Sequence, residues 1–379
     1  MKKNMNILLA RVDYIKKDNY TADYFQLSDS LRKLGHKVTL MGVNYLNKNK
    51  FEKDLILFKM PFNKRTFLVI ELTFLLPIYC IIKNINVVIV SNRIIPATFL
   101  LLILKKLFSI KIIFDVRSIP VEEKMPWDYK QACRVAQKWY DGATFITNGT
   151  KDFIEQSFNL KYDKYAIFTS AVNPILFSTT LTNNVPDNIK LLTKDKIVIF
   201  YHGSISPNRG INLILDAVNQ VKNDFPNILF MSVSEANNLI TDYCNSKNYK
   251  LNENLLLINP VRYERMAAYI NLADICIVPL LRIFWWEISS PLKLMEYLAM
   301  EKPIVLSDIL AHKSVVPPDS KFAVYFNPDI PNDLGMKISE AITNIDHLKN
   351  NGFMGREIVL NKYTWDIQAK ILENFIRTL

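Results

Sequence analysis

Residues 196–221 hold side chains whose types and spacing suit phosphate binding. An apolar strand pattern, KIVIFY, runs into His202-Gly203-Ser204, and a turn carrying Arg209 follows before a helical pattern. A glycine after a strand lets backbone amides approach a ligand closely. An arginine before a helix start adds a cation to the free N–H groups there. The stretch predicts a phosphate-binding strand–turn–helix, although a plain junction with a solvated Arg209 fits the same pattern.

Residues 286–307, WEISSPLKLMEYLAMEKPIVLS, form a second candidate site. Ser290 is predicted to cap a helix, and Pro291 is predicted to take its first position. The free amides of the following residues could bind a pyrophosphate. Glu296, one turn further on, could accept two hydrogen bonds from a ribose diol. An exposed ion pair between Lys293 and Glu296 is the alternative interpretation.

The two stretches follow one another in one half of the chain, separated by a helix-then-strand pattern at residues 262–279, RYERMAAYINLADICIVP. A fourth pattern, EKPIV, starts at Glu301. Together they resemble the retaining GT-B glycosyltransferases, and family four in particular, strongly over residues 196–310 and more weakly at 31–40, at 170–177 and at the chain end.

The resemblance implies a role for each matching residue. Gly203 and Ser204 would lie against the donor phosphates, and Arg209 would neutralise the pyrophosphate. The backbone around Pro291, Leu292 and Lys293 would hold that group, and Glu296 would bind the ribose. Such enzymes need no metal or other cofactor, because fixed cations and helix dipoles stabilise the leaving diphosphate. Arg209, Lys293 and Glu287 are therefore the predicted catalytic residues.

Three positions depart from the family pattern. Ser204 stands where the family often has an arginine. The family's first acidic residue would fall on Ile288, so Glu287 is one position away from it. Ala10-Arg11-Val12 replaces a glycine pair that often follows the first strand. The resemblance therefore says least about the residues in the first half of the chain that would bind the acceptor.

Asp115 and Arg117 follow an apolar strand pattern in the first half. In a parallel sheet they would lie at its carboxyl edge, where ligands bind. They are candidates for binding an acceptor hydroxyl or a lipid phosphate. A loop-anchoring ion pair is the alternative.

Short apolar runs alternate with helical patterns along the whole chain, which predicts parallel sheets covered by helices on both faces. We expect an α/β protein with two tandem Rossmann-like, doubly wound domains facing a cleft, the GT-B arrangement. The predicted parts are an acceptor-binding domain at 1–180, a nucleotide-sugar-binding domain at 195–360 and a helix at 361–379 that returns to the first domain. The polar residues 178–195 are the predicted linker.

The chain of 379 residues carries a net charge of +11, and this charge is uneven. Residues 1–175 contain 27 lysines and arginines against 15 acidic residues, whereas the remainder contains 20 against 21. A basic first half fits an anionic partner such as a membrane surface, and no usual nucleic-acid motif is visible. The four scattered cysteines and the short apolar start favour a reducing, cytoplasmic location and no metal site.

Two apolar stretches, 66–82 and 94–104, lie in this basic half with Lys83, Lys105 and Lys106 at their ends. Both are short for a membrane span, so they predict either core helices or helices docked on an anionic bilayer.

The leading hypothesis is a metal-independent, retaining transfer of a sugar from a UDP- or GDP-type donor to a glycan or lipid-linked acceptor. Cell-surface polysaccharide synthesis at the inner face of the cytoplasmic membrane is the expected setting. A non-catalytic GT-B-like binding subunit and a nucleotide-sugar epimerase are the alternatives, and a basic nucleic-acid-binding protein is the more remote one.

Overall fold

The computed structural model describes residues 4–15, 22–44, 50–52, 54–60, 64–120, 125–180 and 185–379. The chain divides into two compact units. The first unit comprises Met1–Thr169 and Trp365–Leu379, and the second comprises Ser170–Thr364. Residues 170–180, which the sequence pattern grouped with the first half, thus lie in the second unit.

The first unit is built on an eight-stranded sheet with the order β3-β4-β2-β1-β5-β6-β7-β8. All neighbours pair in parallel except the edge strand β3, which pairs antiparallel with β4. The strands are β1 Asn6–Ile15, β2 Lys37–Asn44, β3 Lys50–Glu52, β4 Leu55–Phe58, β5 Val87–Val90, β6 Lys111–Val116, β7 Gly142–Phe145 and β8 Tyr165–Ile167.

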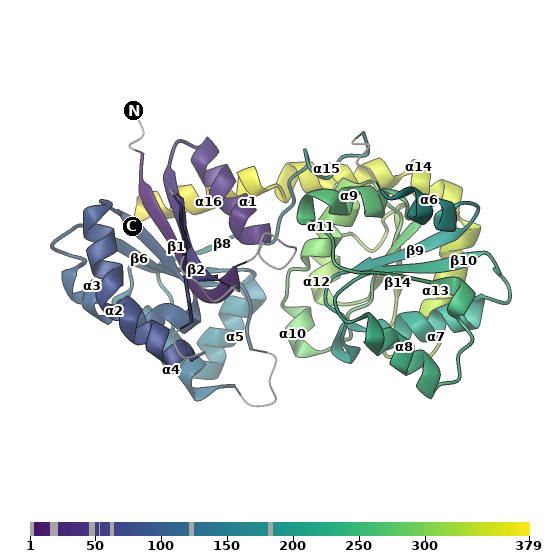
Figure 1. The fold of residues 1–379 in the computed structure, drawn as a ribbon, viewed down its shortest axis with the longest axis horizontal. Coiled ribbons are helices and arrows are strands. Elements are labelled where there is room, and N and C mark those ends of the chain that lie inside the picture. The colour runs from purple at the N-terminus through teal and green to yellow at the C-terminus, as the bar shows by residue number, and fades with distance from the viewer. Residues whose placement is uncertain are drawn as a thin grey trace. The chain divides into compact units, whose positions relative to one another are not determined.

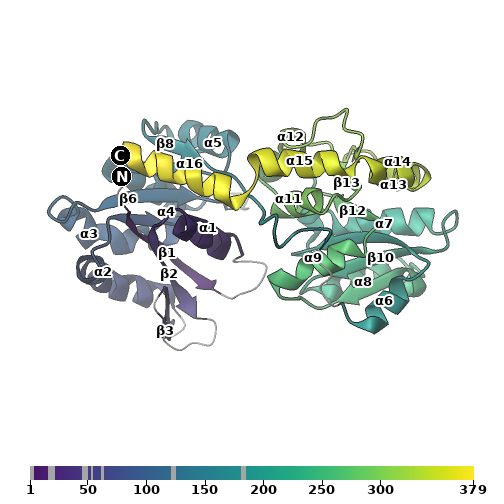
Figure 2. The ribbon, with the colours of Figure 1, turned by 90° about the horizontal axis from the view of Figure 1, so that it is seen from above.

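Helices cover both faces of this sheet, as expected for apolar strands joined by crossovers. α1 and α16 lie side by side, and α2 and α3 pack against each other elsewhere in the unit (Figures 1 and 2). The helices are α1 Ala22–Lys33, α2 Arg65–Ile82, the 3₁₀ segment η2 Asn92–Thr98, α3 Phe99–Leu104, α4 Trp127–Trp139, α5 Asn148–Phe158 and α16 Trp365–Thr378.

The C-terminal helix α16 is held to the first unit by polar contacts as well as by packing. Asp366 accepts a hydrogen bond from the Ser30 hydroxyl at 2.6 Å. Buried Glu373 lies with its Oε1 atom 3.5 Å from Nε2 of His36, which follows α1, and it accepts hydrogen bonds from Lys370 and Arg377 of its own helix. Burial alone would raise the pKa of Glu373, but these two cations outweigh it and lower the pKa to about 2. The helix is therefore an integral part of this unit.

The second unit is built on a six-stranded parallel sheet with the order β11-β10-β9-β12-β13-β14. The strands are β9 Ile197–His202, β10 Ile228–Val233, β11 Leu255–Ile258, β12 Ile275–Val278, β13 Ile304–Ser307 and β14 Ala323–Phe326. The helical segments are α6 Asp187–Thr193, η3 Pro207–Arg209, α7 Ile211–Val221, α8 Asn237–Ser246, η4 Asn252–Asn254, α9 Tyr263–Asn271, α10 Phe284–Glu287, α11 Leu292–Ala299, α12 Leu310–Lys313, α13 Asp333–Thr343, α14 Ile345–Asn350 and α15 Gly352–Lys362.

The predicted α/β fold class is confirmed, because each unit is a helix-covered sheet whose strands are parallel, apart from the edge strand β3. Two local predictions differ. Helix α6 occupies much of the predicted linker 178–195, of which residues 181–184 lie outside the described part of the chain. Strand β1 continues to Ile15, with a register shift between Ala10 and Tyr14 in its pairing with β2. Arg11 therefore lies within a strand rather than in a loop.

All four cysteines are buried and unbonded. Burial raises the pKa of the Cys80 thiol to about 12, so it is protonated and unreactive at neutral pH. One helix in the described part of the chain, α2, is long and apolar enough to cross a membrane by length and composition.

Candidate functional site

The candidate donor site lies at the carboxyl edge of the second sheet. Strands β9, β12 and β13 are neighbours there, and they end at His202, Val278 and Ser307. The predicted donor residues lie in the segments that follow β9 and β12, either in the loops or in η3 and α11. Open α/β sheets bind ligands at this edge.

Gly203, which follows β9, and Lys293, in the first turn of α11, come together although they are 90 positions apart. Gly203 follows β9 with a φ of +103°, a backbone conformation that side chains rarely adopt. A Cβ placed on it would lie 3.6 Å from Nζ of Lys293. The space beside the Gly203 backbone is thus bordered by an ammonium group.

Lys293 is buried and its ammonium group has no hydrogen-bond partner. The Nζ atom lies 3.7 Å from the centre of the Tyr201 ring, which is its favourable cation–π contact. Burial and the nearby Arg209 lower the pKa of Lys293 well below its ordinary value, and Glu296 only partly offsets them. A buried, unpaired cation is costly, and an anionic ligand at this position would offset that cost.

Glu296 is 1% exposed, which rules out the exposed Lys293–Glu296 ion pair considered from the sequence. Its Oε2 atom lies 2.9 Å from Nε2 of His202, but neither atom has a partner with hydrogen-bond geometry. The carboxylate therefore retains an acceptor for a ligand hydroxyl. His202 was not among the predicted donor residues, although its position at the end of β9, just before Gly203, is a usable signal.

Arg209 ends the 3₁₀ segment η3 and stacks on the indole ring of Trp286, with its guanidinium carbon 4.7 Å from the ring centre. Nε1 of Trp286 donates to the backbone oxygen of Asn208 at 2.7 Å. These contacts join the β9 loop to α10 and orient the guanidinium group. Trp286 is thus a positioning residue that was not among the predicted site residues.

Gly210 is required by close packing at the same place. Its φ is +76°, and a Cβ there would lie 1.8 Å from the backbone oxygen of Pro279. The loop that carries Arg209 is thereby held against the loop that follows β12.

The predicted helix start at residues 290–292 is wrong in detail. Pro291 occupies the N-cap position of α11, and Leu292 is its first residue. Ser290 makes no cap, because its hydroxyl accepts from the amide of Ser170 at 3.2 Å and its carbonyl accepts from the Ser170 hydroxyl. Pro291 at the N-cap therefore offers no side-chain acceptor to the first-turn amides of α11.

Two other predicted donor-side residues are engaged with backbone groups. Glu287 ends α10, and its Oε2 accepts from the amide of Leu310 at 2.6 Å. The carbonyl of Ser204 accepts from the Tyr201 hydroxyl at 2.7 Å. Glu287 thus joins α10 to α12.

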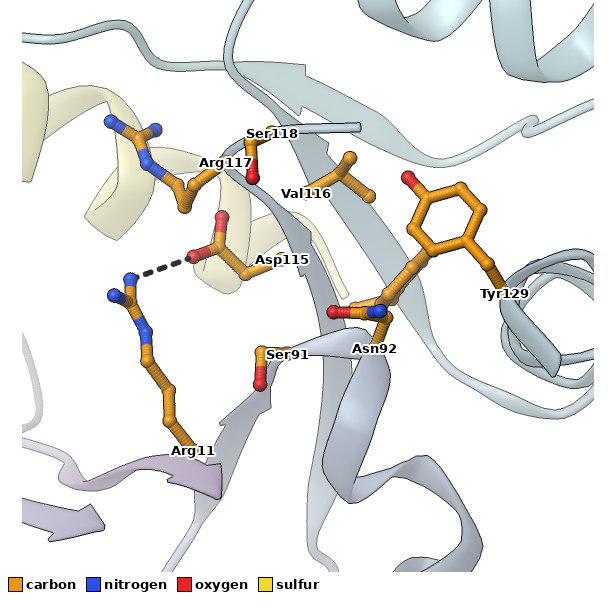
Figure 3. A pocket seen from close by; sticks show the side chains of 9 residues that line it. Arg11, Ser91, Asn92, Asp115, Val116, Arg117, Ser118 and Tyr129 are labelled. Carbon is orange, nitrogen blue, oxygen red and sulfur yellow. Dashed lines mark ion pairs between the residues drawn. The ribbon is translucent and has the colours of Figure 1, made fainter. Parts of the chain in front are cut away.

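The first unit has its own pocket, with a volume of about 90 Å³, at the carboxyl ends of β5 and β6 (Figure 3). Asp115 extends toward Arg11, with 3.7 Å between Oδ2 and a guanidinium nitrogen. Ser91, Ser118 and Tyr129 also line it. Burial raises the pKa of Asp115, while Arg117, Arg11 and the Thr144 hydroxyl act in the opposite direction. This pocket contains the predicted acceptor residues and could bind a small hydroxylated group.

Arg117 borders this pocket, but its guanidinium group is hydrogen-bonded to backbone carbonyl groups. It donates to the carbonyls of Phe168 and Thr169 at 2.6 and 3.2 Å, and it stacks on the Phe168 ring. No direct ion pair joins Arg117 to Asp115 among the contacts of the described residues. The structure thus favours loop anchoring for Arg117 and leaves Asp115 and Arg11 facing the pocket.

Within the described residues, no group of three or more histidine, cysteine, aspartate or glutamate side chains is arranged to hold a metal ion.

Residues 196–344 match the family described as glycosyl transferases group 1. No curated protein matches this chain. Among solved structures, a glycosyltransferase from Rickettsia africae is 15% identical, with 99% of each chain covered and a TM-score of 0.77. Sucrose-phosphate synthase from Thermosynechococcus elongatus is 15% identical, with 98% of this chain and 99% of that chain covered and a TM-score of 0.76.

HepE from Anabaena, in complex with UDP-glucose, is 11% identical, with 99% and 100% of the two chains covered and a TM-score of 0.69. These likenesses show that the chain has the GT-B fold. The match over residues 196–344 covers all six strands of the second sheet and the loops described above. Residues 196–344 of the second unit thus match the glycosyl transferases group 1 family, on a chain that has the GT-B fold.

Proposed function

We propose that the protein transfers a sugar from a UDP- or GDP-type nucleotide sugar to a glycan or lipid-linked acceptor, with retention of anomeric configuration. The observation that carries the donor assignment is the buried, unpaired ammonium of Lys293 beside the Gly203 backbone. A diphosphate in that space would neutralise a charge that the fold otherwise leaves costly.

Each donor group has a matching residue in this proposal. Arg209 and Lys293 would hold the diphosphate and stabilise the negative charge that develops as the sugar leaves. The first-turn amides of α11, at Leu292 and Lys293, would add to this field. Glu296 would accept from the ribose hydroxyls, with His202 beside it. These fixed charges would serve where other enzymes use a metal ion, so no metal is needed.

UDP is the first nucleoside diphosphate to test, because HepE is a GT-B protein with bound UDP-glucose. Retention is inferred from the family resemblance. The basic first half supports an acceptor at an anionic surface, and cell-surface polysaccharide synthesis on the inner face of the cytoplasmic membrane is the setting that we propose.

The test is thermal stabilisation of the protein by UDP, GDP and other nucleoside diphosphates, with Arg209→Ala and Glu296→Ala measured alongside. We expect one nucleoside diphosphate to stabilise the wild type selectively, and we expect both variants to lose most of that thermal stabilisation. Arg282→Ala is the matched control, since Arg282 pairs with Asp329 in the same unit. Absence of stabilisation by every nucleotide would reject the donor site.

A non-catalytic binding subunit is the second candidate, because Ser204 supplies no cation and Glu287 is bonded to the Leu310 amide. Such a protein would bind the nucleotide but release no nucleoside diphosphate from any nucleotide sugar. An epimerase would convert free nucleotide sugars without an acceptor. Product analysis with and without acceptor separates these three outcomes.

A further inference from the structure

Helix α2 exposes a continuous apolar stripe. Phe67, Ile70, Phe74, Ile78 and Ile82 recur every three or four residues and are between 45% and 68% exposed. The opposite face packs into the core through Leu68, Leu72, Leu76 and Cys80. The helix is therefore apolar on its outer face as well as on its inner face, whereas a surface helix of a water-soluble domain is normally polar outside.

Helix α3 and the turn after it enlarge this surface. Phe99, Ile103 and Leu107 are spaced four apart and are 62%, 63% and 76% exposed. α3 packs against α2 in the same unit, and both views show the two helices together (Figures 1 and 2). Contiguous exposed apolar patches of this kind mark interaction sites.

Neither helix crosses a bilayer in this fold. α2 connects β4 to β5 and buries one face on the sheet that both strands belong to. Moving it through a membrane would expose that core face and remove the packing beneath it. The geometry instead permits the outer face to lie in the interface of a membrane, as interfacial helices do.

Positive charges lie at the ends of these helices. Lys64 precedes α2, Lys83 follows it, and Lys106 follows α3, and all three are exposed. The one acidic residue of α2 is Glu71, which is also exposed. An apolar face bordered by lysines is complementary to anionic lipid headgroups.

We propose that the outer faces of α2 and α3 form a docking surface for an anionic lipid bilayer. The apolar stripe enters the boundary between headgroups and acyl chains, and Lys64, Lys83 and Lys106 contact the lipid phosphates. The surface does not involve the donor site, so its test requires no sugar transfer.

The experiment is co-sedimentation of the full chain with phosphatidylcholine vesicles, either pure or containing about one-third phosphatidylglycerol. We expect binding to the anionic vesicles to be at least about tenfold stronger and to weaken with salt. Ile70→Gln/Phe74→Gln and Lys64→Glu/Lys83→Glu should each reduce it at least about tenfold. Glu71→Gln should strengthen binding, because it removes the one charge that repels the anionic lipid.

The matched control is a double variant in the second unit. Leu191→Gln/Leu192→Gln changes two exposed apolar residues of α6, which are 72% and 52% exposed, and should leave vesicle binding unchanged. Thermal unfolding and UDP binding of each variant show whether the fold and donor site are intact, so loss of vesicle binding is separable from loss of the proposed function.

Equal binding of the wild type to both vesicle types, or equal loss in the α6 control, would overturn the proposal. So would a wild-type dimer in light scattering that Ile70→Gln/Phe74→Gln converts to monomers, because a second copy of the chain would then cover this face.

Discussion

Lys293→Met tests the claim that the donor site holds a cation at a cost to stability. The side chain is 9% exposed, and its ammonium group lacks any hydrogen-bond acceptor. Methionine has a similar length without the charge. Replacing a buried charge with an apolar side chain of similar size commonly stabilises a fold by about 1–4 kcal/mol. We therefore expect the ligand-free variant to be more stable by about 2 kcal/mol, which raises the Tm by about 4–8 °C for a unit of this size.

The same change should remove a charge-assisted contact to the diphosphate. Losing such a contact costs about 2–4 kcal/mol, so the Kd for the preferred nucleoside diphosphate should rise about 30- to 700-fold. The assay is differential scanning fluorimetry with and without nucleotide, followed by titration calorimetry. A variant that merely lost core packing would be less stable, so higher thermal stability combined with weaker nucleotide binding distinguishes the loss of a buried charge from the loss of packing.

Lys302→Met is the matched control. Lys302 lies in the same unit, and burial also lowers its pKa. However, its ammonium donates to the carbonyls of Asn271 and Ala273, each at 2.9 Å. Removing it leaves two acceptors unpaired, so we expect a less stable protein with unchanged nucleotide binding. The reasoning about Lys293 is refuted if both variants are destabilised alike and both still bind the nucleotide.

The pH dependence follows from the lowered pKa of Lys293. Nucleotide affinity should fall as pH rises through that pKa, because only the ammonium form attracts the diphosphate, and titration calorimetry across pH measures this. Stability of the ligand-free protein should rise between that lowered pKa and the ordinary value of 10.5, since the unfolded lysine binds the proton that the folded one has released; a profile identical to that of Lys293→Met would contradict the assignment. Gly210→Ala should cost at least about 2–4 kcal/mol in urea unfolding, because φ is positive and the Cβ would meet the Pro279 carbonyl oxygen. Asp115→Asn should reduce acceptor-dependent turnover at least about tenfold with unchanged nucleotide binding, and an equal loss of both would remove Asp115 from the acceptor side.

Several site predictions depended on backbone pattern alone, and these could be made without the structure. Gly203 and Arg209 are placed by a strand, a turn and a helix that adjoin one another in the chain. Local spacing is enough to position such residues. The start of α11 was only partly predictable, because Ser290 is the preferred residue type for a cap but bonds to Ser170 instead.

Other features depend on residues that are distant in sequence. His202 approaches Glu296 because β9 and β12 are neighbours in the sheet and α11 follows β12, and no local pattern reveals this. Glu287 is bonded to the amide of Leu310, 23 positions away. The sequence showed an acid one position from its expected place but could not show what it contacts.

The sequence by itself determined the α/β alternation and the order of the donor-binding residues, because hydrophobic period and turn chemistry are local properties of the chain. The tertiary structure decided which polar groups are buried without partners and which apolar residues remain in water. Lys293 and Glu296 have the spacing of an exposed ion pair, yet packing of α11 buries both. The stripe Phe67–Ile82 has the composition of a core helix, yet the sheet covers only one of its faces. Burial is set by contacts between distant segments, so only the folded chain fixes it.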